Sequence, residues 1–426
     1  MNENNFNLKV PNPLAQSSSI RGVVEEINSE ILRYFQKKDN HLLVCGGGTS
    51  SRCASDGAWT LDMRRNYQNI NIDQSCSEAE IESGVSMAKL LEELNKSNLS
   101  FPIGLSKGTG IGYILTGGIS PLSRKTGLAI DQVIEIEGFW GRGDKFKIKK
   151  PTKKTLINTQ LKWKALCGAA VFLAIVTKIR VKSLPSLPLE IITLTVNHSQ
   201  LILLIKDAEK WPVEASLQWY WGEEIYVYIV VQLGCNASRI KTDYLQSLLD
   251  LNEEIESTIC NSIVDAPVFP KPFKKEKQQK PYCSEIIGLL GRDWGENTEE
   301  IIYKIRKILK ERPHKNCCIA AQQLGGNCST GEKPATSFVH RDSTWKPWIT
   351  ASWEQGDNEG KAKSLKWLED SWKTLEVHSP GIHLAQIHEH LPWHAKELEK
   401  AFGGWLKDLK LLKQELDPNC VLPSLE

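Results

Sequence analysis

The chain has 426 residues, of which 41% are hydrophobic and 24% are charged, a composition that excludes a disordered or collagen-like protein. At about 100–200 residues per domain, this length predicts two or three domains. The formal net charge is +2, so the overall balance indicates neither nucleic acid nor an acidic membrane surface as a partner.

The cysteines and the start of the chain bear on the compartment. There are 11 cysteines, an odd number, and residues 1–10 lack the basic end and apolar run of a signal peptide. We therefore expect reduced thiols in a cytoplasmic protein. The most apolar stretch, residues 165–176, is shorter than the roughly 20 residues of a membrane span, so we expect a buried helix or strand there and no membrane span.

The first third of the chain alternates predicted strands with helical patterns. Apolar residues from Ile20 to Leu32 have helical spacing, and residues 17–19 are serines that would cap this helix. Short apolar runs bounded by turn residues then predict strands, followed by one helix. The predicted strands are 41–45, 59–62, 70–73 and 80–85, and the helix covers 86–95. This mixture predicts an α/β or α+β fold.

The remaining two thirds are less regular. Strands are predicted at 133–137, 145–149, 191–196 and 225–231, and helices at 299–310 and 360–375. Residues 270–281 form a charged loop bounded by prolines. The lysines of residues 145–154 indicate a solvated strand edge more strongly than a patch for polyanions. Eleven of the 14 tryptophans lie at or after Trp211, and we expect most of them in the core.

Two glycine clusters carry the strongest signal. The first, residues 46–50, reads GGGTS and follows the strand predicted at 41–45. The second, residues 104–118, reads GLSKGTGIGYILTGG. Neither has the spacing of a Walker loop or of the dinucleotide fingerprint. Glycine allows close backbone approach, so two such loops would present many N–H groups to one extended ligand, such as a dinucleotide pyrophosphate.

These loops belong to a longer set of motifs. Residues 43–49 read LVCGGGT, and residues 109–133 read TGIGYILTGGISPLSRKTGLAIDQV. Residues 161–177, the segment FVHR at 338–341 and the chain end at 401–419 extend the pattern. Together they resemble the FAD-binding proteins of the vanillyl-alcohol oxidase and p-cresol methylhydroxylase superfamily, and within it the berberine-bridge-enzyme-like oxidases.

The resemblance implies an α+β fold with a two-lobed FAD-binding domain of the p-cresol methylhydroxylase type in residues 1–183. A substrate domain with an antiparallel sheet and flanking helices would follow in residues 184–392, and residues 393–426 would return to the FAD-binding domain. Arg124 and Asp131 would form an ion pair that braces a turn, or contact the cofactor. The cofactor-binding residues that the resemblance implies are Gly46, Gly47, Gly48, Thr49, Ser50, Gly104, Gly108, Thr109, Gly110, Gly112, Tyr113, Gly117, Gly118, Ile175 and Val176.

The chain departs from the family pattern at several positions. Thr49 stands where several relatives attach flavin through a histidine, and Leu105 and Ser106 stand near the place of a flavin-linked cysteine. We therefore expect FAD to be bound non-covalently. His383 begins the segment that replaces a Tyr-x-Asn motif, and Trp405 replaces an asparagine, so the usual base is in doubt.

The implied activity is FAD-dependent oxidation of a small-molecule substrate. A C–H bond beside an alcohol or amine would give hydride to the flavin, and O₂ or another acceptor would reoxidise it. Alternate residues of a strand share a face, so Glu224 and Tyr226 would align, and one of them would serve as base. His340 is a third candidate. The alternative function is that of a flavin-binding or flavin-losing relative acting as a binding protein.

The late histidines raise one further possibility. His390 and His394 stand four residues apart, as metal ligands on a helix can, but Pro392 lies between them. We therefore expect no metal site and give these histidines hydrogen-bonding roles.

Overall fold

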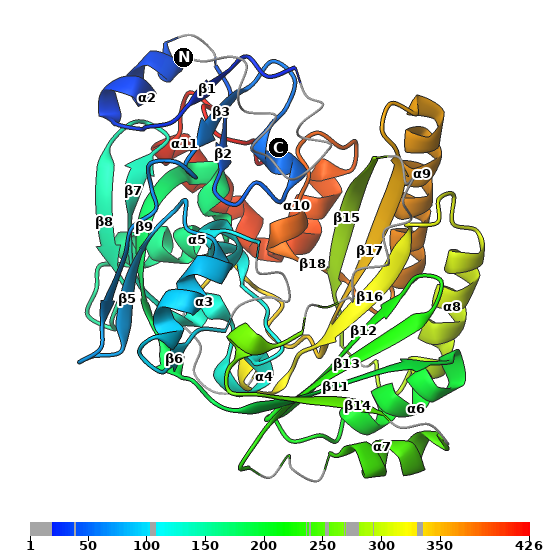
Figure 1. Cartoon of the computed structure of the whole chain (residues 1–426). Coiled ribbons are helices and arrows are strands. Elements are labelled where there is room, and N and C mark those ends of the chain that lie inside the picture. Colours follow the sequence, from blue (N-terminus) through cyan, green and yellow to red (C-terminus); the bar gives the residue numbers. More distant parts are fainter. Residues whose placement is uncertain are drawn as a thin grey trace.

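The computed structural model describes residues 19–426 apart from 38–39, 103–107, 236, 238–239, 252–254, 268, 270–280, 293 and 330–334. Nearly all of the predicted charged loop, and Gly104, Leu105 and Ser106 of the second glycine cluster, therefore lie outside the described residues. The described elements form three main sheets with helices packed around them (Figure 1). The mixed helix and strand content confirms the predicted α+β class.

A small parallel sheet lies near the start of the chain. Its order is β1-β3-β2, formed by β1 (Gly22–Val24), β2 (Leu42–Cys45) and β3 (Trp59–Asp62). The helix predicted from Ile20 is wrong, because Gly22–Val24 instead pairs with β3. A helix, α2, begins only at Ser29 and runs to Gln36, where the side chain of Asn28 accepts from the backbone N–H groups of Glu30 and Ile31.

An antiparallel sheet of the order β4-β5-β9-β7-β8 follows. Its strands are β4 (Ile70–Asp73), β5 (Glu78–Glu82), β7 (Val133–Trp140), β8 (Lys145–Lys149) and β9 (Ala174–Lys182). Two helices pack beside it, α3 (Met87–Asn95) and α5 (Ile157–Leu173). The apolar stretch 165–176 was expected to be a buried helix or strand. Its first part is the buried end of α5, and its last residues begin strand β9.

A second antiparallel sheet has the order β14-β11-β13-β12-β16-β17-β15-β18 and fills the right side of Figure 1. Its strands are β11 (Leu189–Val196), β12 (Ala215–Trp221), β13 (Ile225–Gln232), β14 (Glu256–Cys260), β15 (Tyr282–Leu290), β16 (Cys318–Gln323), β17 (Trp345–Glu354) and β18 (Gly381–Ile382). The helices on its outer face are α6 (His198–Ala208), α7 (Thr242–Leu249), α8 (Thr298–Lys310) and α9 (Asn358–Leu375).

Tryptophans fill the space between this sheet and its helices. The rings of Trp294 and Trp345 stack with centroids 5.7 Å apart, and Trp219 lies 6.3 Å from Trp294. All three are buried, as is Trp372 of α9. The expected core role of the late tryptophans is therefore confirmed for this group, where large rings cover one face of the sheet.

The chain end packs against elements near its start, as the red and blue ribbons of Figure 1 show. Helices α10 (His394–Phe402) and α11 (Leu406–Leu416) lead to a tail whose Val421 carbonyl accepts from the N–H of Leu42 in β2. Lys413 of α11 is buried and donates to the Phe172 carbonyl at 2.8 Å, the Leu422 carbonyl at 2.9 Å and the carboxylate of Asp417 at 2.5 Å. The domain boundaries at 183 and 392 remain our proposal.

Two features concern the compartment. All eleven cysteines are free thiols. None of the described helices combines the length and the apolar content that a bilayer crossing requires.

Replacing Lys413 by methionine would leave the buried Asp417 carboxylate with only the N–H groups of Val421 and Leu422 and no charged partner, and would remove the donor to the backbone carbonyls around it. We expect the free energy of unfolding to fall by about 3–5 kcal/mol, the range for a broken buried ion pair. Urea unfolding of Lys413→Met measures this, with Lys410→Met, at an exposed position of the same helix, as the matched control. Equal stability of the two variants would contradict the prediction.

Candidate functional site

The two glycine loops touch through their backbones. A Cβ atom on Gly47 would lie 2.5 Å from the backbone nitrogen of Gly110, and a Cβ atom on Gly110 would lie 2.7 Å from that of Gly47. The second loop is fixed to the start of α3, where the N–H of Met87 donates to the Thr109 carbonyl at 2.8 Å. Because either Cβ would collide with backbone, which cannot rotate away, glycine is required on both sides.

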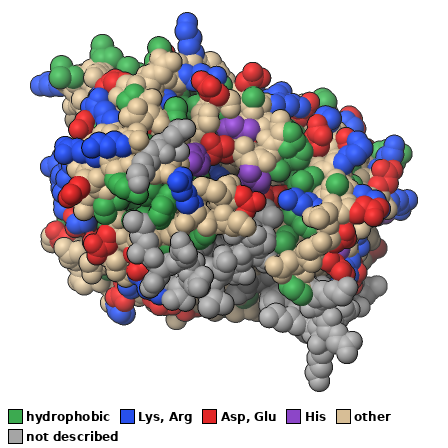
Figure 2. All heavy atoms as spheres, turned by 90° about the horizontal axis from the view of Figure 1, so that it is seen from above, with side chains coloured by type: hydrophobic (Ala, Val, Ile, Leu, Met, Phe, Trp, Pro, Cys, Tyr) green, Lys and Arg blue, Asp and Glu red, His purple; other side chains and the backbone are tan. Residues whose placement is uncertain are grey.

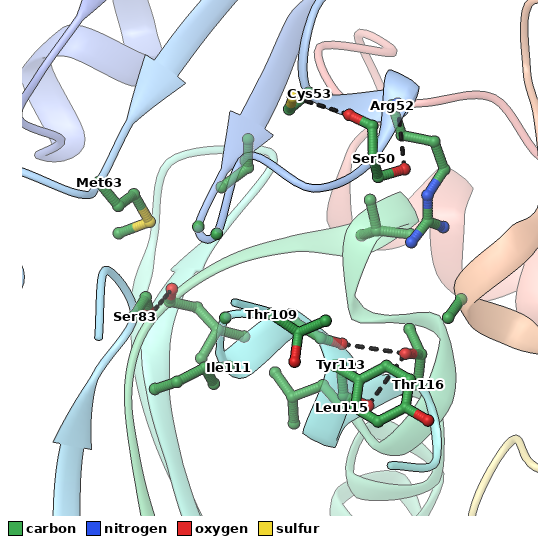
Figure 3. Close-up of a pocket in the computed structure, with 18 of the residues that line it drawn as sticks. Ser50, Arg52, Cys53, Met63, Ser83, Thr109, Ile111, Tyr113, Leu115 and Thr116 are labelled. Carbon is green, nitrogen blue, oxygen red and sulfur yellow. Dashed lines mark hydrogen bonds between the residues drawn. The ribbon is translucent and has the colours of Figure 1, made fainter. Parts of the chain in front are cut away.

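A cavity opens between these loops, and about 1060 Å³ of space there is not filled by atoms, part of it open to solvent. Its inner wall is apolar, with Met63, Ile111 and Leu115 among the side chains that Figure 3 shows around it. Ten of the predicted cofactor residues line it: Gly46, Gly47, Gly48, Thr49, Ser50, Thr109, Gly110, Gly112, Tyr113 and Val176. The prediction that two loops far apart in sequence enclose one site therefore agrees with the geometry.

The other predicted cofactor residues have different places. Gly117 has a φ of 118° and lies against Phe338 and His383, and Gly118 has a φ of 67° and lies against Ala129. Both residues have positive φ values, a backbone conformation that favours glycine, so the backbone alone accounts for glycine at these positions. Ile175 is buried in the core between the first sheet and the chain end. Gly108 is exposed, and Gly104 lies outside the described residues.

Arg52 is a lining residue that the sequence reasoning missed. It follows the first glycine loop, and Figure 3 shows its guanidinium extending into the cavity. One Nη donates to the Leu384 carbonyl at 3.3 Å, while Nε is buried with no hydrogen-bond partner among the described residues. Burial lowers the pKa of Arg52. Its signal in the sequence was a cation two residues after the end of a predicted anion-binding loop.

His383 lies beside the cavity, against Tyr113 and Gly117, and is not among the residues that line it. Its ring centroid is 6.1 Å from that of Tyr113, which lines the cavity. The side chain is fully buried, and in the described structure neither ring nitrogen has a hydrogen-bond partner. Burial, together with the charges of Lys346 and Arg52, lowers the pKa of His383 well below its ordinary value. The imidazole is therefore neutral, with one acceptor and one donor available.

Lys346 on β17 is a second buried titratable group beside His383. Its ammonium lies 4.7 Å from the ring centroid of Trp348, and burial lowers the pKa of Lys346 to about 7. The strand register places Lys346 beside Gln322 of β16, and Gln322 beside Gln218 of β12, so the three share one face of the sheet. Gln322 Nε2 and Gln218 Oε1 are buried without partners in the described residues. Buried polar atoms of this kind indicate a missing ligand or water.

The predicted catalytic residues lie elsewhere. The hydroxyl of Tyr226 donates to Glu224 at 2.8 Å at an exposed position beside the β12–β13 turn, and this hydrogen bond raises the pKa of Tyr226. Nε2 of His340 is hydrogen-bonded to the Lys400 carbonyl at 2.6 Å. None of these three side chains belongs to the described lining of the cavity.

Two further pairings differ from expectation. Asp131 does not pair with Arg124 but accepts two hydrogen bonds from Arg341, at 2.9 and 2.8 Å. Arg124 instead donates to the carbonyls of Leu324 and Trp211, at 3.1 and 2.8 Å. Both arginines join residues near 130 to the large sheet, because each finds acceptors that sequence neighbours cannot supply at the right angle.

A buried charge network joins the first glycine loop to the rest of the molecule. Glu285 of β15 accepts from the Ser51 hydroxyl at 3.2 Å and pairs with His388 at 3.2 Å and His390 at 2.8 Å. His388 also pairs with Glu397 of α10 at 2.9 Å. Burial opposes the charged state of His388, but the two carboxylates outweigh it and raise its pKa to about 9. Burial likewise opposes the charged state of Glu285, but the histidines lower its pKa to about 2.

A second cavity lies next to this network. It is lined by His41, Glu389, His390 and His394, and shares Arg52 with the first cavity. Histidine side chains beside acidic ones are visible around a hollow in the view from above (Figure 2). The predicted hydrogen-bonding roles agree with the geometry, since His390 contacts Glu285 and His394 contacts the Ser424 carbonyl at 3.2 Å.

Comparison with known proteins gives this site a class. Residues 24–148 match the family model described as FAD binding domain. An FAD-linked oxidoreductase of Dictyostelium discoideum is 23% identical over 424 residues, which cover 96% of this chain and 87% of that protein.

Solved structures extend the likeness to the whole chain. Berberine bridge enzyme from Eschscholzia californica matches with a TM-score of 0.75 and 19% identity, over 99% of this chain and 93% of that one. Chitooligosaccharide oxidase matches with a TM-score of 0.78 and 15% identity, over 97% and 94%. The chain thus carries an FAD-binding domain. It has the fold of the berberine-bridge-enzyme-like branch of the FAD-linked oxidases, which confirms the resemblance drawn from its sequence.

Alanine at Gly47 or Gly110 would force the two loops apart. We expect either variant to bind FAD at least about tenfold more weakly than the parent, because a shift of the loops misaligns several N–H donors at once. Fluorescence titration of the apoprotein with FAD measures this. Gly404→Ala is the matched control, since a Cβ atom there meets nothing within 4 Å and Gly404 does not line the cavity. If Gly47→Ala and Gly110→Ala both bound FAD as tightly as the parent, the loops would not need this backbone contact.

The charged network predicts a pH dependence of stability. The folded-state pKa of His388 lies above its ordinary value of 6.5, so its stabilising contribution is complete below that pH and is lost as pH rises through about 9. We expect the Tm of the parent to fall over this range more steeply than that of His388→Gln. His198→Gln, on α6, is the control and should keep the parent slope. Parallel curves for the parent and His388→Gln would contradict the assignment.

Proposed function

We propose that this protein is an FAD-dependent oxidoreductase that takes a hydride from a substrate C–H bond next to an alcohol or amine. The carrying observation is a cavity formed where two glycine loops meet, whose lining residue Tyr113 lies next to the buried His383, with the buried Lys346 close enough to affect the pKa of that histidine. The relatives named as FAD-linked oxidoreductases support the same class.

The residues present fit FAD. The closely approaching loops give backbone N–H groups for a pyrophosphate, and the apolar wall suits the ring systems. Thr49, in the first loop, offers no nucleophile of the kind that attaches flavin. Cys53 is the one cysteine in the described lining, and its thiol donates to the Ser50 carbonyl at 2.9 Å. These features support non-covalent binding.

Bound FAD would supply a hydride acceptor, and the side chains of this chain would manage the proton. With a pKa near 7, Lys346 is partly unprotonated at neutral pH and is able to accept the proton of a substrate hydroxyl or amine. Neutral His383 would orient that group by a hydrogen bond. Gln322 and Gln218 extend the polar row, so they would bind further polar groups of the substrate. Tyr226, Glu224 and His340 remain the candidates proposed from sequence.

Reoxidation by O₂ or another small acceptor completes the proposal. The binding-protein alternative draws support from the departures at His383 and Trp405. It predicts a flavin that no substrate reduces.

The purified protein distinguishes these functions. We expect a yellow protein whose flavin stays in the supernatant after acid precipitation, and whose colour is bleached anaerobically by members of a panel of alcohols, sugars and amines. Flavin in the acid pellet would contradict non-covalent binding. A colourless protein that takes up no added FAD would overturn the proposed cofactor and activity together.

Lys346→Met tests the proton acceptor. Removing a general base slows the reaction by about 10²–10⁴-fold, so we expect flavin reduction at pH 7 to fall at least about 100-fold. In the parent, kcat/KM should rise as pH increases through about 7, because the amine must be unprotonated, and the variant should lose this rise. Stopped-flow reduction measures both. Lys361→Met, at an exposed position of α9, is the control.

A further inference from the structure

Two buried cysteines flank the first glycine loop. Cys45 is the last residue of β2, and Cys53 is the last residue of the short 3-10 helix Ser51–Cys53 that follows the loop. Their side chains belong to one small apolar cluster with Val23 and Ala54, and the two thiols share a hydrogen bond. The segment 45–53, which contains the loop, therefore begins and ends at two neighbouring sulfur atoms.

The backbone around both cysteines is fixed by strand β3 and the residue after it. The carbonyl of Cys53 accepts from the Thr60 hydroxyl at 3.0 Å, and the carbonyl of Cys45 accepts from the N–H of Met63 at 3.0 Å. The thiol of Cys53 donates to the Ser50 carbonyl at 2.9 Å, as Figure 3 shows. The two side chains are thus held close together in the folded protein, which is the first requirement for a disulfide.

The two thiols differ in access and in acidity. Cys53 lines the FAD cavity, whereas Cys45 is fully buried and is not in the described lining. The hydrogen bond with Cys45 lowers the pKa of Cys53, and the charge of Arg64 acts in the same direction against the effect of burial. The same hydrogen bond, together with burial, raises the pKa of Cys45. Because the thiolate is the reactive form, Cys53 is the better nucleophile toward a small oxidant in the cavity.

We propose that Cys45 and Cys53 are a redox-active pair that hydrogen peroxide oxidises to a disulfide across the first glycine loop. In the first step the Cys53 sulfur attacks one peroxide oxygen, the O–O bond breaks, and a sulfenic acid and water form. In the second step the Cys45 sulfur attacks the sulfenic sulfur, the S–O bond breaks, and the hydroxyl leaves as water with the Cys45 proton. Two thiols and one hydrogen peroxide thus give one disulfide and two waters.

The proposed function would supply this oxidant beside the pair. Reoxidation of reduced FAD by O₂ transfers two electrons and two protons to O₂, so it yields hydrogen peroxide in the cavity that Cys53 lines. This source of peroxide rests on the proposed function with O₂ as the acceptor. The reactivity of the pair does not, because peroxide added from outside reaches the same cavity.

The disulfide would change how the loop fits FAD. An S–S bond of about 2.05 Å is much shorter than a hydrogen bond between two thiols, so the 3-10 helix would move toward β2. The Cys53 thiol would also stop donating to the Ser50 carbonyl. The loop has little room for this movement, because Gly47 already meets the backbone of Gly110. We therefore expect the oxidised protein to bind FAD at least about tenfold more weakly, since small misplacements of several donors are costly.

Peroxide treatment of the FAD-loaded protein tests the proposal. After treatment the remaining thiols are alkylated, and peptides are mapped by mass spectrometry. Trypsin cuts after Arg52, between the two cysteines, so a disulfide leaves the two peptides joined. We expect this joined pair, together with FAD in the filtrate measured by its fluorescence. Dithiothreitol should restore both thiols and the affinity for FAD.

Variants separate the roles of the two thiols, each compared with its own untreated sample. Cys45→Ala should give no joined peptides and should stop at a sulfenic acid on Cys53, which dimedone traps. Cys53→Ser should give neither product. Cys76→Ser/Cys420→Ser removes two exposed thiols and is the matched control, which should form the disulfide and release FAD as the parent does. The parent is mapped without any substitution, so a variant that fails to fold leaves the test intact.

Three results would overturn the proposal. These are unmodified Cys45 and Cys53 after the exposed thiols have been oxidised, a disulfide that joins either residue to another cysteine, or an oxidised protein that binds FAD as tightly as the reduced one. A protein that forms the Cys45–Cys53 disulfide with added peroxide, but whose flavin no substrate reduces, would support the pair and contradict the proposed function.

Discussion

The backbone contact between Gly47 and Gly110 is the constraint on which the site depends. One glycine follows strand β2 of the parallel sheet, and the other begins the 3-10 helix Ile111–Thr116 that comes after α3, so their contact joins two parts of the FAD-binding region. Each removes the Cβ atom that would separate the loops. The cavity between the two loops is lined by residues of both and by Arg52.

A second set of interactions holds the large sheet against the two glycine loops. The network of Glu285, His388 and Glu397 reaches the first loop through Ser51, and Arg341 binds Asp131 beside the second. Buried charges of this kind add little net stability, but they strongly penalise arrangements in which a partner is missing. Their role is therefore to fix how the sheet faces the loops, which in turn places the buried His383 beside Tyr113 of the cavity wall.

Patterns of short range were readable in the sequence. The strands of the first third, the later helices and both glycine loops follow from periodicity and from turn residues, which act over a few positions. The helix wrongly predicted from Ile20 shows the limit of such short-range patterns. Apolar residues from Ile20 to Leu32 have helical spacing, but β3 offers residues 22–24 parallel pairing across more than thirty residues of sequence, and tertiary pairing outweighed local preference.

The sequence by itself determined the class of fold and the two glycine loops that line one cavity, and it places threonine at position 49, where the resemblance expects an attachment residue. Only the tertiary structure decided which polar side chains face that site. Glu224 and Tyr226 were candidates for the base because alternate residues of a strand share one face. That pattern places the two side chains on the same face, but it does not say what the face packs against. Lys346 and His383 gain their lowered pKa values from burial between segments distant in the chain, and burial is a property of packing that no local pattern contains.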